Sequence, residues 1–178
     1  MVLTKTNTIV ARTIRLATGA EYSHVSLSLD EGLSPMYSFA RKYINFPFYG
    51  AMVTEEIGKG VYGKFPIVPC RIYRLPVTDV QYQGVKQMVE TMWQNSDHYG
   101  YNYIGLIFNY FGRSRHYDNR FFCSEFVYQV LRQNDVIDFN KSPCMVRPQD
   151  FMNIDAEIIY EGNLNEFNNE TILRSPLL

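Results

Sequence analysis

The segment SHVSLSLD, residues 23–30, alternates strictly between polar and apolar side chains. Because successive side chains of a β-strand point to opposite faces, this period of two predicts a strand with one apolar face. Val25 and Leu27 would face the core, while His24 and Ser26 would lie on the other face. The turn-forming residues that follow predict a hairpin, so the chain must build an antiparallel sheet with a layer packed against one side.

The same patterns predict the remaining elements. Thr78 and Gln81 have the spacing of a capping box, which marks the start of a helix. Residues 101–112 are strongly apolar and predict a buried helix, and the run that begins at Cys123 predicts an amphipathic one. The expected strands are 23–30, 36–43, 51–57, 70–77 and 156–162, with a short extended piece at 136–139. The expected helices are 7–17, 78–93, 101–112 and 123–134, with a turn at 147–151.

Size and charge favour one globular domain. The 178 residues are 46% hydrophobic and 20% charged, with a formal net charge of -1. A chain of this size can bury a sizeable core, so residues 1–178 are expected to form one domain with a polar tail at 163–178. Near-neutral charge gives no electrostatic reason to expect nucleic acid as a partner.

Cysteine and histidine usage points to a reducing compartment without a metal. Cys70, Cys123 and Cys144 are odd in number and lack close pairing, which argues against a disulfide framework. The chain has three histidines and no C-x-x-C or H-x-x-x-H motif, so neither a zinc site nor another cofactor is expected. Arg12 and Arg15 interrupt the apolar start of the chain, and no apolar run reaches about 18 residues. We therefore expect a cytoplasmic protein with no secretory signal and no integral membrane segment.

Cys123 stands directly at the start of its predicted helix. Helix N-termini carry unpaired N–H groups and partial positive charge, which lower the pKa of a thiol and favour the nucleophilic thiolate. A cysteine nucleophile needs a base, and His24 on a strand offers a more rigid imidazole than the loop residues His98 and His116. A free cysteine is also among the most buried residue types, so a purely structural role remains open.

Several segments, in this order, resemble one known superfamily. YSHVSLSLD, MYSFARK, YGYNYIGL, FFCSEFVYQVL and VRPQDF are similar to the circularly permuted papain-like proteins. That group includes the YaeF/YiiX-type permuted amidases, the NlpC-type cell-wall peptidases and the lecithin:retinol acyltransferase group. In the permuted branch the histidine strand precedes the cysteine helix, as it does here. The resemblance covers most of residues 1–162. It implies a single α+β domain whose mainly antiparallel sheet packs against the helix that carries the nucleophile.

The resemblance also implies roles for individual residues. Cys123 would be the nucleophile and His24 its base. The third polar residue of the family, commonly Glu or His, corresponds most closely to Ser38, which brings no charge to stabilise an imidazolium. Glu55 or Glu56, on the next strand, is the alternative orienting group.

Two further residues on the His24 strand are candidate oxyanion or substrate contacts. Tyr22 lies two residues before His24, about 7 Å along a strand, and Ser26 extends the same face. Each has an equally ordinary interpretation, Tyr22 as a packing residue at a strand start and Ser26 as a residue on the solvent side.

The function implied is that of a cysteine hydrolase. It would be an amidase or peptidase that cleaves an amide or related acyl bond through a thioester on Cys123. A peptide, a cell-wall fragment or an acyl-amide would serve as substrate. Two alternatives stay open: a lipid acyltransferase or thioesterase like the lecithin:retinol acyltransferase group, and a catalytically inactive binding domain on the same fold.

Overall fold

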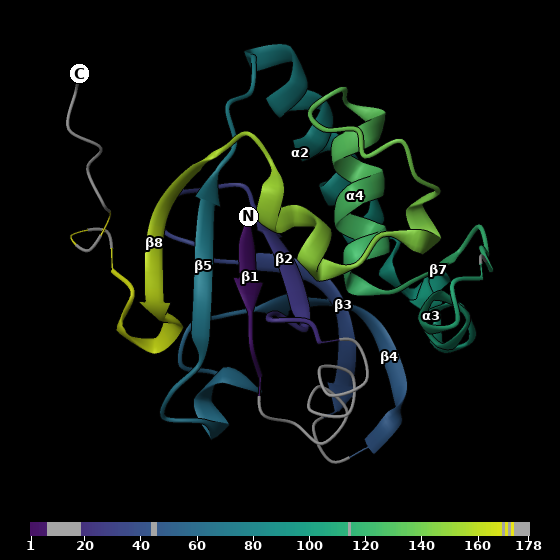
Figure 1. The fold of residues 1–178 in the computed structure, drawn as a ribbon, viewed down its shortest axis with the longest axis horizontal. Helices are drawn as coiled ribbons and strands as arrows, with labels where there is room; N and C mark the ends of the chain where they lie inside the picture. Colours follow the sequence, from purple (N-terminus) through teal and green to yellow (C-terminus); the bar gives the residue numbers. More distant parts are fainter. Residues whose placement is uncertain (7–18, 44–45, 114, 169, 171, 173–178) are drawn as a thin grey trace.

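The structure is a computed structural model of the chain, and it describes residues 1–6, 19–43, 46–113, 115–168, 170 and 172. The helix expected at residues 7–17 lies outside the described residues. Figure 1 shows the helices gathered on one side of a broad sheet that spans the molecule.

Six strands form the main sheet, in the spatial order β4-β3-β2-β1-β5-β8. Every neighbouring pair in it is antiparallel. The predicted α+β class with a mainly antiparallel sheet is therefore confirmed. The strands are β1 (Val2–Thr4), β2 (His24–Ser28), β3 (Met36–Tyr43), β4 (Phe46–Glu55), β5 (Pro69–Arg74) and β8 (Glu157–Asn163).

The central strand β1 was not expected from the sequence. It has only three residues, yet it pairs with β2 on one side and β5 on the other, and Thr4 lies opposite His24. Val2 and Leu3 are both fully buried because the two faces of this strand are both covered. Residues 136–139 belong to no strand; the backbone N–H of Phe139 instead donates to the hydroxyl of Tyr128.

Three described helices accompany the sheet: α2 (Asp79–Gln94), α3 (Tyr103–Tyr110) and α4 (Cys123–Gln133). The capping box at the start of α2 is confirmed, since Thr78 Oγ1 accepts from the N–H of Gln81 and the Thr78 N–H donates to Gln81 Oε1. The α4 helix packs against β2 and β3. The predicted amphipathic character of α4 is also confirmed, because Phe126 and Val130 share one core cluster with Val25 of β2.

A second core cluster lies on the opposite face of the sheet. Short 3-10 helices close over it, η1 (Tyr62–Lys64) and η5 (Leu164–Glu166), each contributing a buried side chain. Alternation along β1 shows the two sides clearly, since Leu3 belongs to the helix-side cluster and Val2 to the other. Side chains on both faces of β2 are therefore removed from solvent.

The expectation that residues 101–112 form a buried helix is wrong. The α3 helix has eight residues and lies at the edge of the molecule (Figure 1), with Ile104 47% exposed and Ile107 58% exposed. A short helix at the rim presents only one side to the rest of the protein, so its other side keeps apolar residues in water.

A pair of short parallel strands places the starts of α3 and α4 next to each other. Strands β6 (Gly100–Tyr101) and β7 (Arg120–Phe121) pair in parallel and each leads directly into a helix. The N–H of Asn102 donates to the carbonyl of Phe121 at 3.0 Å. As a result, Asn102 and Phe122, the N-cap residues of α3 and α4, are neighbours.

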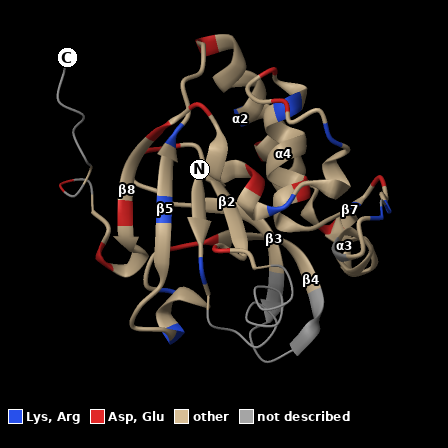
Figure 2. Cartoon of the chain, in the orientation of Figure 1, with Lys and Arg blue, Asp and Glu red and all other residues tan. Residues whose placement is uncertain are grey.

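Charges of opposite sign are interspersed along the chain. Figure 2 shows a basic segment on β5 beside an acidic segment on β8, where Arg71 Nε donates to Glu161 Oε2 at 2.9 Å. Such pairing fits the net charge of -1. Across the part of the chain that the structure describes, no helix has the length and apolarity needed to cross a bilayer.

Candidate active site

Cys123 is the first residue of α4 and lines a small pocket of about 50 Å³. The residue is 6% exposed and packs in the helix-side core cluster, but its side chain also faces this pocket. Because Cys123 occupies the first helical position, its backbone N–H has no intrahelical acceptor. The other walls of the pocket include Tyr22, Tyr101, Leu106, Asn109 and Arg147.

The structure brings His24 against Cys123. His24 is the first residue of β2, and its side chain is 14% exposed. The Cys123 sulfur lies close enough to the imidazole to influence its pKa. Burial lowers the pKa of His24, but the carboxylate of Glu55 and the sulfur of Cys123 outweigh it and hold the pKa well above the ordinary 6.5. The imidazolium form is therefore favoured beside the Glu55 carboxylate.

Glu55, not Ser38, contacts the imidazole of His24. Both carboxylate oxygens of Glu55 lie 3.0 Å from His24 Nε2. The interaction with His24 and hydrogen bonds from other side chains outweigh burial and lower the pKa of Glu55. Ser38 is fully buried and donates its hydroxyl to the carbonyl of Val25 at 2.8 Å. Of the three predicted orienting groups, the structure thus places Glu55 on the histidine, while Ser38 bonds the backbone of β2 and Glu56 pairs with Lys59.

Two hydroxyl groups hold the Glu55 carboxylate in place. Ser26 Oγ donates to Glu55 Oε2 at 2.6 Å, and the Tyr62 hydroxyl donates to the same oxygen at 3.2 Å. Neither interpretation of Ser26, as a substrate contact or as a residue on the solvent side, fits its position. Ser26 is fully buried, because η1 covers this face of β2 and places Tyr62 beside Glu55.

Tyr22 lies where the sequence placed it, in the wall of the same pocket as Cys123. Burial raises the pKa of Tyr22 to about 12, so its hydroxyl keeps its proton over the physiological range. A phenol that stays protonated is a hydrogen-bond donor, as an oxyanion contact requires. The role of Tyr22 in binding an oxyanion stays a prediction.

A buried carboxylate holds the N-terminus of the cysteine helix. Glu125 in the first turn of α4 is fully buried, and its Oε2 accepts from the Phe122 N–H at 3.4 Å and from Asn102 Nδ2 at 3.2 Å. His116 Nδ1 lies 3.0 Å from Glu125 Oε1. Burial raises the pKa of Glu125 and these hydrogen bonds oppose the rise.

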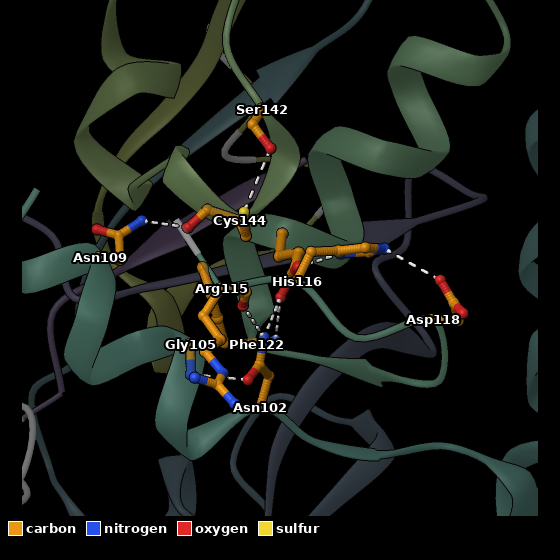
Figure 3. A network of polar contacts seen from close by, with 10 residues as sticks. Asn102, Gly105, Asn109, Arg115, His116, Asp118, Phe122, Ser142 and Cys144 are labelled. Carbon is orange, nitrogen blue, oxygen red and sulfur yellow. Dashed lines mark hydrogen bonds and ion pairs between the residues drawn. The ribbon is translucent and has the colours of Figure 1, made fainter. Parts of the chain in front are cut away.

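Asn102 connects this network to α3. Its Oδ1 accepts from the Gly105 N–H at 2.7 Å, and its Nδ2 also donates to the carbonyl of Arg115 at 3.1 Å (Figure 3). The amide therefore caps α3 while it bonds the start of α4. This arrangement fixes the backbone around Cys123 without using a group of the Cys123–His24–Glu55 chain.

The remaining cysteines and His116 are engaged elsewhere. Cys70 is buried in the other core cluster, and burial raises the pKa of its thiol to about 12. Cys144 is fully buried, and its sulfur lies 3.2 Å from the hydroxyl of Ser142 (Figure 3). His116 contacts Glu125 and Asp118.

Three residues of the site were not anticipated from the sequence. Tyr62 follows a glycine-rich loop with no pattern that marks it as a partner of Glu55. Asn109 and Arg147 lie in the pocket wall, Asn109 within an apolar helix and Arg147 directly before Pro148. A polar side chain inside an otherwise apolar helical segment was the one available signal for Asn109.

Comparisons of the chain with protein-family models, with curated proteins and with solved structures each returned no match. Among the described residues, no group of three or more His, Cys, Asp or Glu side chains is arranged to hold a metal ion.

Proposed function

We propose that the protein is a cysteine hydrolase that cleaves an amide or related acyl bond. Cys123 is the nucleophile and His24 is the base. Glu55 orients His24 and stabilises its protonated form. The supporting observation is that the Cys123 sulfur influences the pKa of the His24 imidazole, which contacts the Glu55 carboxylate, and that Cys123 lies in a pocket wall. A nucleophile held by a base that is itself oriented by a third group is the arrangement that acyl transfer requires.

The contacts assign the two ring nitrogens of His24. Glu55 lies against Nε2, so that nitrogen carries a proton toward the carboxylate. In the proposed arrangement the other ring nitrogen, Nδ1, serves the sulfur. A proton moved from Cys123 to Nδ1 gives a thiolate–imidazolium pair, which the Glu55 charge stabilises from the other side.

The reaction follows from that pair. The thiolate attacks the carbonyl carbon, and the backbone N–H of Cys123 together with the Tyr22 hydroxyl donates to the oxyanion. His24 passes its Nδ1 proton to the leaving amine as the C–N bond breaks and leaves a thioester. Water then attacks the thioester, His24 accepts its proton, and the S–C bond breaks to release the acid and restore the thiol.

The alternative of an inactive binding domain had its main support in Ser38. An uncharged third residue would leave the imidazolium without a counter-charge. With Glu55 against Nε2, the site has both a charge and a geometry suited to catalysis. This contact favours the hydrolase over the binding domain.

An acyl-enzyme should be trapped on Cys123. Incubation with p-nitrophenyl acetate is expected to release a burst of p-nitrophenol and to add one acetyl group to the protein. Mass spectrometry of the intact protein and of its peptides should place the acetyl group on Cys123, because a thiolate in a pocket reacts faster than buried thiols. Cys144→Ala serves as the matched control and should keep the burst. Loss of the burst in that variant but not in Cys123→Ala would overturn the proposal.

A further inference from the structure

Arg147 presents a cationic group to the pocket that holds the nucleophile. Its side chain is half-buried and lines the same pocket wall as Cys123. It also lines a wider pocket of about 440 Å³, whose walls include Lys141 and Asp150. The two pockets therefore adjoin at Arg147.

The orientation of this guanidinium is fixed by a neutral residue. Arg147 Nε donates to Asn109 Oδ1 at 2.8 Å, and Nη2 donates to the Asn109 carbonyl at 2.7 Å. Asn109 is 2% exposed and donates its own Nδ2 to the carbonyl of Cys144 at 2.7 Å (Figure 3). These hydrogen bonds hold the guanidinium of Arg147 against the buried side chain and backbone of Asn109, so the guanidinium has a fixed position.

No carboxylate neutralises this charge within the described residues. The ion pairs of that part of the chain do not include Arg147. The nearby carboxylate of Asp150 is bonded to Lys141 Nζ at 2.8 Å and to the backbone N–H of Arg147. A half-buried cation is costly to hold without an anionic partner.

The free part of the guanidinium matches a carboxylate. Arginine carries five N–H donors in a planar fork, and Asn109 uses two of them, one on Nε and one on Nη2. Three N–H donors remain, and they include one on Nη1 and one on Nη2. These two donors point along the same edge of the guanidinium, which can bind a carboxylate through two parallel hydrogen bonds.

We infer that the substrate carries a carboxylate close to the scissile amide, and that Arg147 is the residue that binds it. Peptides with a free C-terminal carboxylate and N-acyl amino acids are substrates of this class. The inference rests on the proposed function for the identity of the scissile bond. The binding of a carboxylate beside Cys123 is testable without any turnover.

Iodoacetate and iodoacetamide give a matched pair of probes. In both, the Cys123 sulfur forms a bond to the same methylene carbon as iodide leaves, but only iodoacetate carries a carboxylate. Bromoacetyl-glycine and bromoacetyl-glycinamide form a second, longer pair. In bromoacetyl-glycine the carboxylate lies one residue further from the reactive methylene carbon. For each pair, the alkylation rate with the acid is divided by the rate with the amide, both at Cys123 and at the free thiol of glutathione. For at least one pair, we expect this ratio at Cys123 to exceed the glutathione ratio by about tenfold or more, as a charge-assisted contact predicts.

Arg147→Gln should reduce that ratio to the glutathione value. Arg113→Gln, a change at an exposed arginine outside this pocket, should leave it as in the wild type. A ratio that Arg147→Gln does not alter in either pair would overturn the inference. Thermal unfolding of both variants checks that the Asn109 contacts were not needed for folding.

A measurement on the unmodified protein covers the case in which Arg147→Gln does not fold. Acetate should protect Cys123 from iodoacetamide, and acetamide at the same concentration should not. Equal protection by the two would contradict carboxylate binding. If Cys123 reacts slowly with iodoacetamide but still reacts faster with the acid reagents than with the amides, the catalytic proposal would be rejected. The role of Arg147 in carboxylate binding would be supported.

Discussion

Replacing His24 with alanine should slow the alkylation of Cys123 by iodoacetamide more than about tenfold at pH 6. In the proposed mechanism His24 holds the thiolate as an ion pair, and Glu55 and Cys123 together raise the pKa of the imidazole despite its burial. Without the imidazole, the thiolate would form only near the free-thiol pKa of about 8.5. Rates are read from the alkylated Cys123 peptide by mass spectrometry across a series of pH values.

The matched control is His98→Ala, which removes an exposed imidazole. This variant should alkylate at the wild-type rate. Cys70 and Cys144 act as internal references, because both are buried and neither is expected to respond to His24→Ala. An unchanged pH profile of Cys123 in His24→Ala would show that the sulfur is not activated by this histidine.

Glu55→Ala should lower the free energy of unfolding by about 3–5 kcal/mol near pH 6, the cost of removing one partner of a buried ion pair. The side chains of Glu55 and His24 are each 14% exposed, so solvent screens the pair only weakly. The change also leaves the hydroxyls of Ser26 and Tyr62 without their acceptor. Urea unfolding of the variant and the wild type gives the difference directly.

The pH dependence of that difference follows from the two pKa shifts. The pKa of Glu55 is lowered, so its contribution is present above its ordinary value of 4.5 and is lost as the pH falls through the lowered pKa. The pKa of His24 is raised, so its contribution is complete below 6.5 and is lost as the pH rises through the raised pKa. The difference should therefore be largest between about pH 5 and 6.5.

Glu56→Ala is the control for this experiment. Glu56 is the next residue, its side chain is 44% exposed, and it pairs with Lys59 on the surface. Its removal should change the free energy of unfolding by less than about 0.5 kcal/mol. Equal losses from Glu55→Ala and Glu56→Ala would contradict a structural role for the Glu55–His24 contact.

Local patterns predicted the elements that carry the site. The alternation around His24 and the amphipathic run after Cys123 depend on residues close together in sequence, and both elements appear as β2 and α4. The choice between Ser38 and Glu55 was not accessible in the same way. It depends on how β3 and β4 are placed against β2, which the residues of one strand do not encode.

Other features were missed because the sequence pattern that would mark them is too short or joins residues far apart in the sequence. Strand β1 has three residues, too few for a period to be recognised, and its place between β2 and β5 is set by pairing across the sheet. The segment around Pro148 was expected to start a turn, and Asp150 does accept the backbone N–H of Arg147 as a helix-start residue would. The contact of Arg147 with Asn109 joins residues 38 positions apart, so only the folded chain reveals it.

The protonation state of His24 tests the thiol–imidazole–carboxylate chain most directly. Nuclear magnetic resonance of the ring nitrogens, followed against pH, reports the pKa of this histidine in the wild type and in Cys123→Ala. We predict a wild-type pKa well above 6.5 that falls in Cys123→Ala, because the sulfur contributes to the rise. A pKa near 6.5 in the wild type, unchanged when the sulfur is removed, would contradict the coupling on which the proposed chemistry rests.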